Sequence, residues 1–317
     1  MSWASAWLTA TLERIAGRFG FSDGFLGVLI AFGADAPEIC SAVAALLSSQ
    51  HEVGLGLVVG SNIFNLAGLL GLSAVVAGRI SIGRKGLWFN GGVSLAVSVI
   101  VLAMLLEMIS VGTSLVLLIL LLVPYFVLTA TRPARVGHLR LPRGLRAFLG
   151  AAVIHSHHDA RRRLVVPQGS WWDVVRLVAA LSVIVGASFG AVNCAVWLGQ
   201  RWGIDEAITG MLLLAVLTSL PNVVAAVKLA TDGLGAAVVS ESLNSNSLNI
   251  IAGIALPAVL IGFVSPEPSI IYAAIWLLVM KLVTLLAASR EEGLSRTSGA
   301  LIILMYLVFV AAVVARP

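Results

Sequence analysis

The sequence contains very little charge. Of its 317 residues, 11% are charged and 59% are hydrophobic, and the mean hydropathy is +1.03. In soluble domains about 25% of the residues are charged. A chain with so few charged side chains could not cover its surface in water. The composition therefore excludes an ordinary soluble protein and predicts an integral membrane protein.

Cysteine is scarce as well. Cys40 and Cys194 lie inside apolar segments and show no paired spacing, so neither a disulfide framework nor a thiolate metal site is expected. The sequence also lacks a Gly-x-x-x-x-Gly-Lys phosphate loop, which argues against ATP-driven transport. Residues 1–10 lack the positively charged start of a cleavable signal peptide, and none is expected.

Acidic residues are fewer than basic ones, 15 against 20, and the formal net charge is +5. Such an excess is compatible with nucleic-acid binding. Nearly all the Lys and Arg residues lie in short gaps between apolar stretches, however. We interpret them as charges of cytoplasmic loops and expect a lipid bilayer, not a nucleic acid, as the partner.

Apolar segments long enough to cross a bilayer recur along the whole chain. A transmembrane helix needs about 20 such residues. Strong segments are expected near residues 24–48, 54–77, 88–108, 111–130, 173–199, 207–230, 235–263, 269–288 and 298–315, and a weaker one near 3–19. The prediction is an all-α membrane protein with about ten transmembrane helices.

The basic residues predict how these helices are oriented. If ten spans alternate across the membrane, 18 of the 20 Lys and Arg residues, Lys281 among them, fall on one side, and only Arg201 and Arg316 fall on the other. Such an excess marks the cytoplasmic side, so both termini are predicted to be non-cytoplasmic. A short chain without appended soluble domains is typical of a prokaryotic plasma (inner) membrane. The sequence leaves the oligomeric state open.

The long loop at residues 131–171 is interpreted as a cytoplasmic linker between two halves, residues 1–130 and 172–317. It contains eight Arg residues and the His155, His157 and His158 cluster. Clustered histidines could bind a transition metal. Because the neighbouring Arg side chains would repel a cation, we favour a solvated spacer.

The two halves contain the same short pattern. Residues 34–38 and 61–65 of the first half correspond to residues 218–222 and 245–249 of the second. In each half, 28 residues separate a proline, Pro37 or Pro221, from the last asparagine of the pattern. Recurrence at a fixed spacing indicates an internal repeat, with repeat segments near residues 24–77 and 207–263.

Five spans separate the two prolines, so the helices that carry them are predicted to start on opposite faces of the membrane. The halves would then be inverted-topology repeats of five helices each. Such repeats, with broken helices near the membrane centre, are typical of secondary transporters. Pro37 and Pro221 are the expected helix breaks, because proline lacks a backbone donor.

Polar residues gather beside the breaks. Asp35 and Glu38 share one helix face, and so do Ser61 and Asn65, because the members of each pair are three or four residues apart. Carboxylate, amide, hydroxyl and carbonyl oxygens are the ligands of hard cations such as Ca²⁺. The alternative is a structural role, in which the acids pair with basic residues or face a water-filled crevice. No Lys or Arg lies in the spans around the first repeat, and each buried carboxylate costs about 2.5–3.5 kcal/mol, so we favour an ion site.

These two patterns resemble the α-repeats of the calcium/cation antiporter superfamily, in particular the sodium/calcium exchanger family, and the second match is the weaker one. The resemblance implies a central site that holds Ca²⁺ and Na⁺ or H⁺ in alternation, with Glu38 as the principal carboxylate of the first half and with no cofactor. The candidate ion-binding residues are Glu38, Asp35, Ser61, Asn65, Thr218, Ser219, Asn222, Ser245 and Asn249, and the further candidates are Glu241, Asn62 and Asn246.

The chain departs from the family pattern at several of these positions. Asn222 stands where the family usually has Glu, and Asn249 where some members have Asp. Conversely, Asp35 replaces a family Ser, and Glu241 stands where the family often has Asn. We hypothesise that carboxylates have been relocated within the site, so that their number is kept.

The expected activity is antiport by alternating access, not channel flow or enzymatic catalysis. An empty site would carry bare carboxylates through a medium of low dielectric, which is costly, and bound cations remove that cost. Two alternatives remain: an exchanger of other mono- or divalent cations, and a degenerate member that no longer transports. An intramembrane enzyme is disfavoured because Asp35 and Glu38 come from one helix and no nucleophile–base pair accompanies them.

Overall fold

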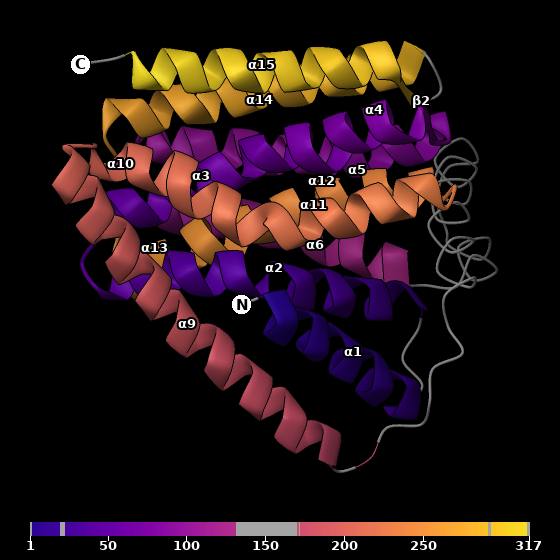
Figure 1. Cartoon of the computed structure of the whole chain (residues 1–317), viewed down its shortest axis with the longest axis horizontal. Coiled ribbons are helices and arrows are strands. Elements are labelled where there is room, and N and C mark those ends of the chain that lie inside the picture. Colours follow the sequence, from indigo (N-terminus) through magenta and orange to yellow (C-terminus); the bar gives the residue numbers. More distant parts are fainter. Residues whose placement is uncertain (1, 20–22, 131–169, 171, 291–292, 316–317) are drawn as a thin grey trace.

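The computed structural model describes residues 2–19, 23–130, 170, 172–290 and 293–315. This part of the chain is almost entirely helical, which confirms the all-α prediction (Figure 1). Most helices lie side by side along the long axis of the molecule, whereas α1 (Ser2–Phe19) and α9 (Trp172–Trp202) are inclined to them. The predicted linker, apart from Ser170, and its histidine cluster lie outside the described residues.

Eight helical segments within the described ranges are long and apolar enough to cross a membrane. They are His51–Ala77 (α3, η1 and α4), Arg84–Leu105 (α5), Val111–Leu128 (within α6, Val111–Ala130), Trp172–Trp202 (α9), Glu206–Thr231 (α10, η2 and α11), Gly235–Leu260 (α12, η3 and α13), Pro268–Arg290 (α14) and Arg296–Val314 (α15). Helices α1 and α2 (Asp23–Leu47) precede them. Segments α6, α9 and α15 are exposed along most of their length, mainly through aliphatic side chains, as expected of surfaces that face lipid.

Three of the long segments contain a π-helical stretch. Helix α3 (His51–Asn65) continues through η1 (Leu66–Leu72) into α4 (Ser73–Ala77). Stretch η2 (Thr209–Leu214) joins α10 (Glu206–Ile208) to α11 (Ala215–Thr231), and η3 (Ile251–Ala255) joins α12 (Gly235–Ile250) to α13 (Leu256–Leu260). π-helical turns are rare and occur frequently at functional sites.

Two expectations from the sequence are wrong. Helices α2 and α11 continue past Pro37 and Pro221 instead of breaking there. A proline removes a single backbone hydrogen bond, and neighbouring groups in a membrane protein can compensate for it. Lys281, counted among the cytoplasmic loop residues, lies within α14 and is buried, with 1% of its surface exposed.

Segment α3 lies at the centre of the molecule and packs against η2 with almost no space between the backbones. A Cβ atom on Gly60 would lie 2.3 Å from the carbonyl oxygen of Met211, and one on Gly210 would lie 2.2 Å from that of Val53. Small residues allow membrane helices to approach this closely. The glycines therefore fix the contact between a helix of the first half and one of the second.

Two short strands, which were not predicted from the sequence, pair at one end of the molecule. Strand β1 (Arg79–Ser81) pairs in an antiparallel manner with β2 (Gly293–Ser295), and Ile80 lies opposite Leu294. A three-residue strand has too little alternation to be recognised in the sequence.

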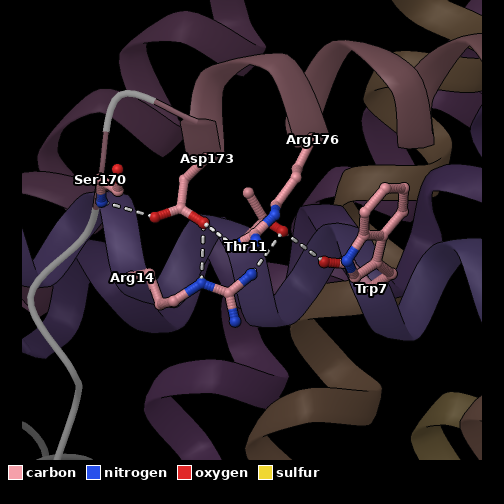
Figure 2. A network of polar contacts seen from close by, with 6 residues as sticks. All are labelled: Trp7, Thr11, Arg14, Ser170, Asp173 and Arg176. Atoms are coloured by element: carbon pink, nitrogen blue, oxygen red, sulfur yellow. Dashed lines mark hydrogen bonds and ion pairs between the residues drawn. The ribbon is translucent and has the colours of Figure 1, made fainter.

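Helices α1 and α9 are held together at their polar ends by Asp173 (Figure 2). One oxygen of this carboxylate accepts hydrogen bonds from Arg14 Nε at 3.0 Å and Arg176 Nη1 at 3.1 Å, and the other accepts from the backbone N–H of Ser170 at 2.7 Å. Arg14 also donates to Thr11 of α1, at 3.0 Å. The carboxylate is buried, whereas both guanidinium groups reach solvent.

Candidate functional site

Asp35 and Glu38 of α2 face α11 and α12, and both carboxylates are buried, with 1% and 2% of each residue exposed. Asp35 Oδ1 accepts a hydrogen bond from Ser245 Oγ at 2.7 Å and another from Asn222 Nδ2 at 3.2 Å. Among the described residues, neither acid forms an ion pair with Lys or Arg. The two negative groups therefore depend on neutral donors.

Asn222 connects the two acids. Its Nδ2 also donates to Glu38 Oε1, at 3.4 Å, and the second oxygen of Glu38 accepts from Asn249 Nδ2. A single amide nitrogen of α11 thus donates to both carboxyl groups of α2. The structure thus brings the two acids of α2 into contact with side chains of α11 and α12.

Helix α3 contributes Ser61 and Asn65. Asn65 Nδ2 donates to Ser245 Oγ at 3.4 Å, while the Ser61 hydroxyl donates to the backbone carbonyl of Val58 at 3.1 Å. Both residues are fully buried. Ser245 of α12 therefore accepts a hydrogen bond from Asn65 of α3 and donates one to Asp35 of α2, so it connects the three helices.

The remaining candidates occupy the second half. Thr218 donates back to the carbonyl of Leu214 at 2.9 Å, one turn earlier in the chain, and Ser219 beside it is fully buried. Glu241, one helical turn before Ser245, is half-buried, and its charge is close enough to repel that of Asp35. Glu241 thus extends the acidic character of the site along α12.

Asn62 and Asn246 lie on the faces of α3 and α12 that meet each other. Each side chain donates its Nδ2 to the backbone carbonyl of the other residue, at 3.2 Å in both directions. Their amide oxygens are buried and accept no hydrogen bond from the described residues. We therefore assign them first to helix packing and keep them only as further candidates for binding.

The site contains more hydrogen-bond acceptors than donors. Asp35 Oδ2, Asn65 Oδ1 and Asn249 Oδ1 are buried and, among the described residues, accept no hydrogen bond. Buried oxygens are almost always satisfied, and a cluster of carboxylate and amide oxygens is the ligand set of a hard cation. The residues present therefore fit a metal cation as substrate.

Two of the π-helical stretches begin beside the site. Stretch η1 starts directly after Asn65, and η3 starts two residues after Asn249. The last candidate of each repeat is thus followed by a widened turn. Sequence reasoning missed these stretches, because a helix containing a π turn has nearly the same apolar pattern as an uninterrupted helix.

Sequence reasoning also missed a polar stripe on α5 outside the site. Asn90, Ser94 and Ser98 recur every four residues in an apolar span and are buried. Asn90 Nδ2 donates to Ser240 Oγ of α12 at 3.3 Å, and the other two contact Lys281. The spacing of the three residues was the available signal, because it places them on one helix face.

Comparison with known proteins places these observations in a family. The family model described as sodium/calcium exchanger protein matches residues 1–132 and 172–315. The chain is 27% identical over 298 residues to the inner membrane protein YrbG of Escherichia coli, covering 92% of this chain and 87% of that protein. It is 24% identical over 328 residues to the sodium/calcium exchanger MaX1 of Methanosarcina acetivorans, covering 96% and 93%.

Solved structures show the same fold. A structure of the sodium-calcium exchanger NCX_Mj aligns with a TM-score of 0.60 and 22% identity over 98% of this chain and 93% of that one. The H⁺/Ca²⁺ exchanger CAX aligns with a TM-score of 0.66 and 14% identity over 99% and 82%. At such low identity the likeness concerns the fold alone.

Proposed function

Because the chain belongs to the sodium/calcium exchanger family, we propose that it is a secondary active antiporter that exchanges Ca²⁺ for Na⁺ or H⁺ across a membrane. Its family consists of transporters, and the chain is a multi-pass membrane protein. The proposal concerns the ions and the residues that bind them. The observation that carries it is the excess of buried oxygens around Asp35 and Glu38.

The proposed ion site lies between α2, α3, α11 and α12. Asp35 and Glu38 supply the charge, and the neutral oxygens come from Asn65, Asn222, Ser245 and Asn249 and from the hydroxyl groups of Ser61, Thr218 and Ser219. Both acids now accept hydrogen bonds from amide nitrogens. Rotation of an amide about its terminal bond exchanges its nitrogen for its oxygen, so Asn222 and Asn249 can stabilise the bare carboxylates or bind a cation beside them.

This exchange of partners gives a physical basis for antiport. A cation bound between the acids neutralises them, whereas a bare pair of carboxylates would be costly to move through a medium of low dielectric. The loaded site can then open to either side of the membrane. One ion must leave before another is carried back, which couples the two fluxes without ATP.

We further propose the organisation that this mechanism needs. The halves, residues 1–130 and 172–317, would be inverted repeats of five spans, with both termini non-cytoplasmic and the protein in a prokaryotic inner membrane. The reciprocal Asn62–Asn246 contact and the close packing of α3 against η2 support a two-fold relation between the halves.

A second candidate function is exchange of other mono- or divalent cations. It is favoured by Asn222 and Asn249, which are neutral where family members carry acids. A third possibility, based on the same two asparagines, is a degenerate family member that no longer transports ions. The relocated carboxylate of Asp35, which directly contacts Asn222, argues for a working site that keeps its charge.

The test is uptake of radioactive Ca²⁺ into proteoliposomes that are loaded with Na⁺ and diluted into Na⁺-free buffer. We expect uptake that depends on the Na⁺ gradient, or on a proton gradient if H⁺ is the counter-ion, and that is lost in Glu38→Gln. Glu107→Gln serves as a matched control, because Glu107 is exposed on the turn after α5. Absence of Ca²⁺ uptake under both gradients would contradict the proposal.

A further inference from the structure

Lys281 is a basic side chain in the interior of the molecule. It lies near the middle of α14 and is among the largest fully buried side chains, with 1% of its surface exposed. A charged side chain at the centre of a bilayer costs about 2.5–3.5 kcal/mol on insertion scales, and such residues are functional as a rule. The candidate ion site makes no use of it.

The ammonium group of Lys281 has three partners, and all three belong to α5. Its Nζ donates to Ser98 Oγ at 2.7 Å, to Ser94 Oγ at 3.0 Å and to the backbone carbonyl of Ser94 at 3.2 Å. An ammonium group has three donors, so the three oxygens satisfy it completely. Among the described residues, Lys281 forms no ion pair with a carboxylate.

The three oxygens are held in place by the helix itself. Ser94 and Ser98 are one turn apart on α5 and are 0% and 5% exposed. The helices are in close contact one turn away, because a Cβ atom on Gly91 would lie 2.2 Å from Leu285 Cδ2. The oxygens therefore form a small, buried and neutral group of acceptors around the ammonium group, which is called the pocket below.

The position of this pocket gives it a role. Helix α5 belongs to the first half of the chain and α14 to the second, and the next polar residue of the stripe, Asn90, holds α12 of the second half. The polar stripe of α5 thus joins two helices of the opposite half. A cation in the pocket stabilises the seam between the halves.

We propose that Ser94 and Ser98 form a binding site for a primary ammonium ion, and that Lys281 is its permanent, covalently attached occupant. The site is distinct from the proposed transport site and does not depend on which ions are carried. Because the occupant is attached to α14, its effective concentration at the α5 oxygens is high, which favours the contact between the two helices.

The test uses the full-length protein in detergent and compares Lys281→Ala with Lys281→Met. Alanine opens space for a small ion, whereas methionine fills that space without a charge. We expect Lys281→Ala to melt below the wild type, and methylammonium to raise its melting temperature by about 2–4 °C, as a ligand worth about 1 kcal/mol does. Choline at the same ionic strength is too large to enter and should have no effect. The wild type and Lys281→Met should not respond to methylammonium.

A second variant ties the effect to the pocket. Adding Ser98→Ala to Lys281→Ala should abolish the response to methylammonium. A response that persists in this double variant, or a Lys281→Ala protein that responds equally to choline or to neither ion, overturns the proposal. If Lys281→Ala is recovered only with methylammonium in the growth and purification media, the proposal is supported. If it is recovered under neither condition while Lys281→Met is, the proposal fails.

Discussion

Asn62 and Asn246 donate hydrogen bonds to each other's backbone carbonyl oxygens, and both distances are 3.2 Å. The two residues follow the serine of the repeated pattern, Ser61 or Ser245, in their respective halves. The same contact made in both directions is what a two-fold relation between α3 and α12 requires. These helices carry four of the proposed ion ligands, so the contact also fixes the width of the site.

Replacing either asparagine by alanine is therefore expected to destabilise the protein. Asn62→Ala and Asn246→Ala each remove one of the two buried hydrogen bonds between the helices, and such a bond contributes about 0.5–1.5 kcal/mol. Thermal unfolding in detergent measures the loss. Asn193→Ala, at an exposed position of α9, is the control and should change the melting temperature little. Equal melting temperatures for all three variants would show that the reciprocal contact contributes nothing.

If a carboxylate has been relocated to Asp35, a carboxylate introduced at Asn222 should replace it. Asp35→Ser should raise the KM for Ca²⁺ about tenfold or more, because a charged partner of this kind is worth about 1.5–3 kcal/mol. Adding Asn222→Glu should restore most of the affinity, since Asn222 Nδ2 lies only 3.2 Å from Asp35 Oδ1. Ca²⁺ uptake into proteoliposomes decides the matter. A double variant no better than Asp35→Ser would refute the relocation.

Glu241 completes the same hypothesis. It lies one helical turn before Ser245, the residue whose hydroxyl group donates to Asp35. We expect Glu241→Asn to weaken divalent transport less than Asp35→Ser does, because Glu241 is only half-buried and solvent screens its charge. Uptake measured at low and high ionic strength should show a defect that is larger at low ionic strength. Full activity of both single variants would mean that neither acid serves transport.

The contact between α1 and α9 depends on Asp173 more than on either arginine. Asp173→Asn removes the negative charge that three donors share and should cost about 1–2 kcal/mol of stability, since solvent screens the half-exposed guanidinium groups. Arg176→Gln should cost less, because half of the Arg176 side chain is exposed. Thermal unfolding tests both, with Asp232→Asn at an exposed turn as the control. A larger loss in Arg176→Gln would contradict this ranking.

The surface between α13 and α14 carries a pH-dependent group. Burial and the carboxylates of Asp205 and Glu206 raise the pKa of Glu267, whose backbone N–H donates to a carboxylate oxygen of Glu52 at 3.2 Å. The folded protein therefore binds this proton more tightly than the unfolded chain does. The stability contributed by protonation is present below the ordinary glutamate pKa, about 4.3, and is lost as the pH rises through the raised folded value.

The variant Glu267→Gln isolates this effect. It should melt above the wild type at pH 8, where the charged glutamate is repelled by its neighbours, and the difference should vanish near pH 4. Melting curves of both proteins across this range provide the measurement. A wild type that is the more stable of the two at pH 8 would reverse the sign and refute the account.

The sequence predicted the class of fold and most of the polar residues that lie together between α2, α3, α11 and α12, because both depend on local patterns. Apolar length located the spans, and the repeated spacing brought Asp35 and Glu38 together with Asn222, Ser245 and Asn249. The position of Lys281 could not be predicted in this way. A lysine in an apolar segment usually indicates the end of a span. The oxygens that accept hydrogen bonds from Lys281 lie 183 and 187 residues away in the sequence, so no local pattern indicates that it is buried. The π turns and the continuity of helix through Pro37 escaped prediction for the same reason, since tertiary contacts decide them.

The arrangement of the site also has a consequence for the order in which the protein is made. Asp35 and Glu38 enter the membrane with the second helix, but Asn222 follows Asp35 by 187 residues. Until the second half has been synthesised, Asp35 and Glu38 lack the hydrogen-bond donors that Asn222, Ser245 and Asn249 provide. Until α11 and α12 are in place, the two carboxyl groups therefore need other donors or protonation to lie in the membrane interior.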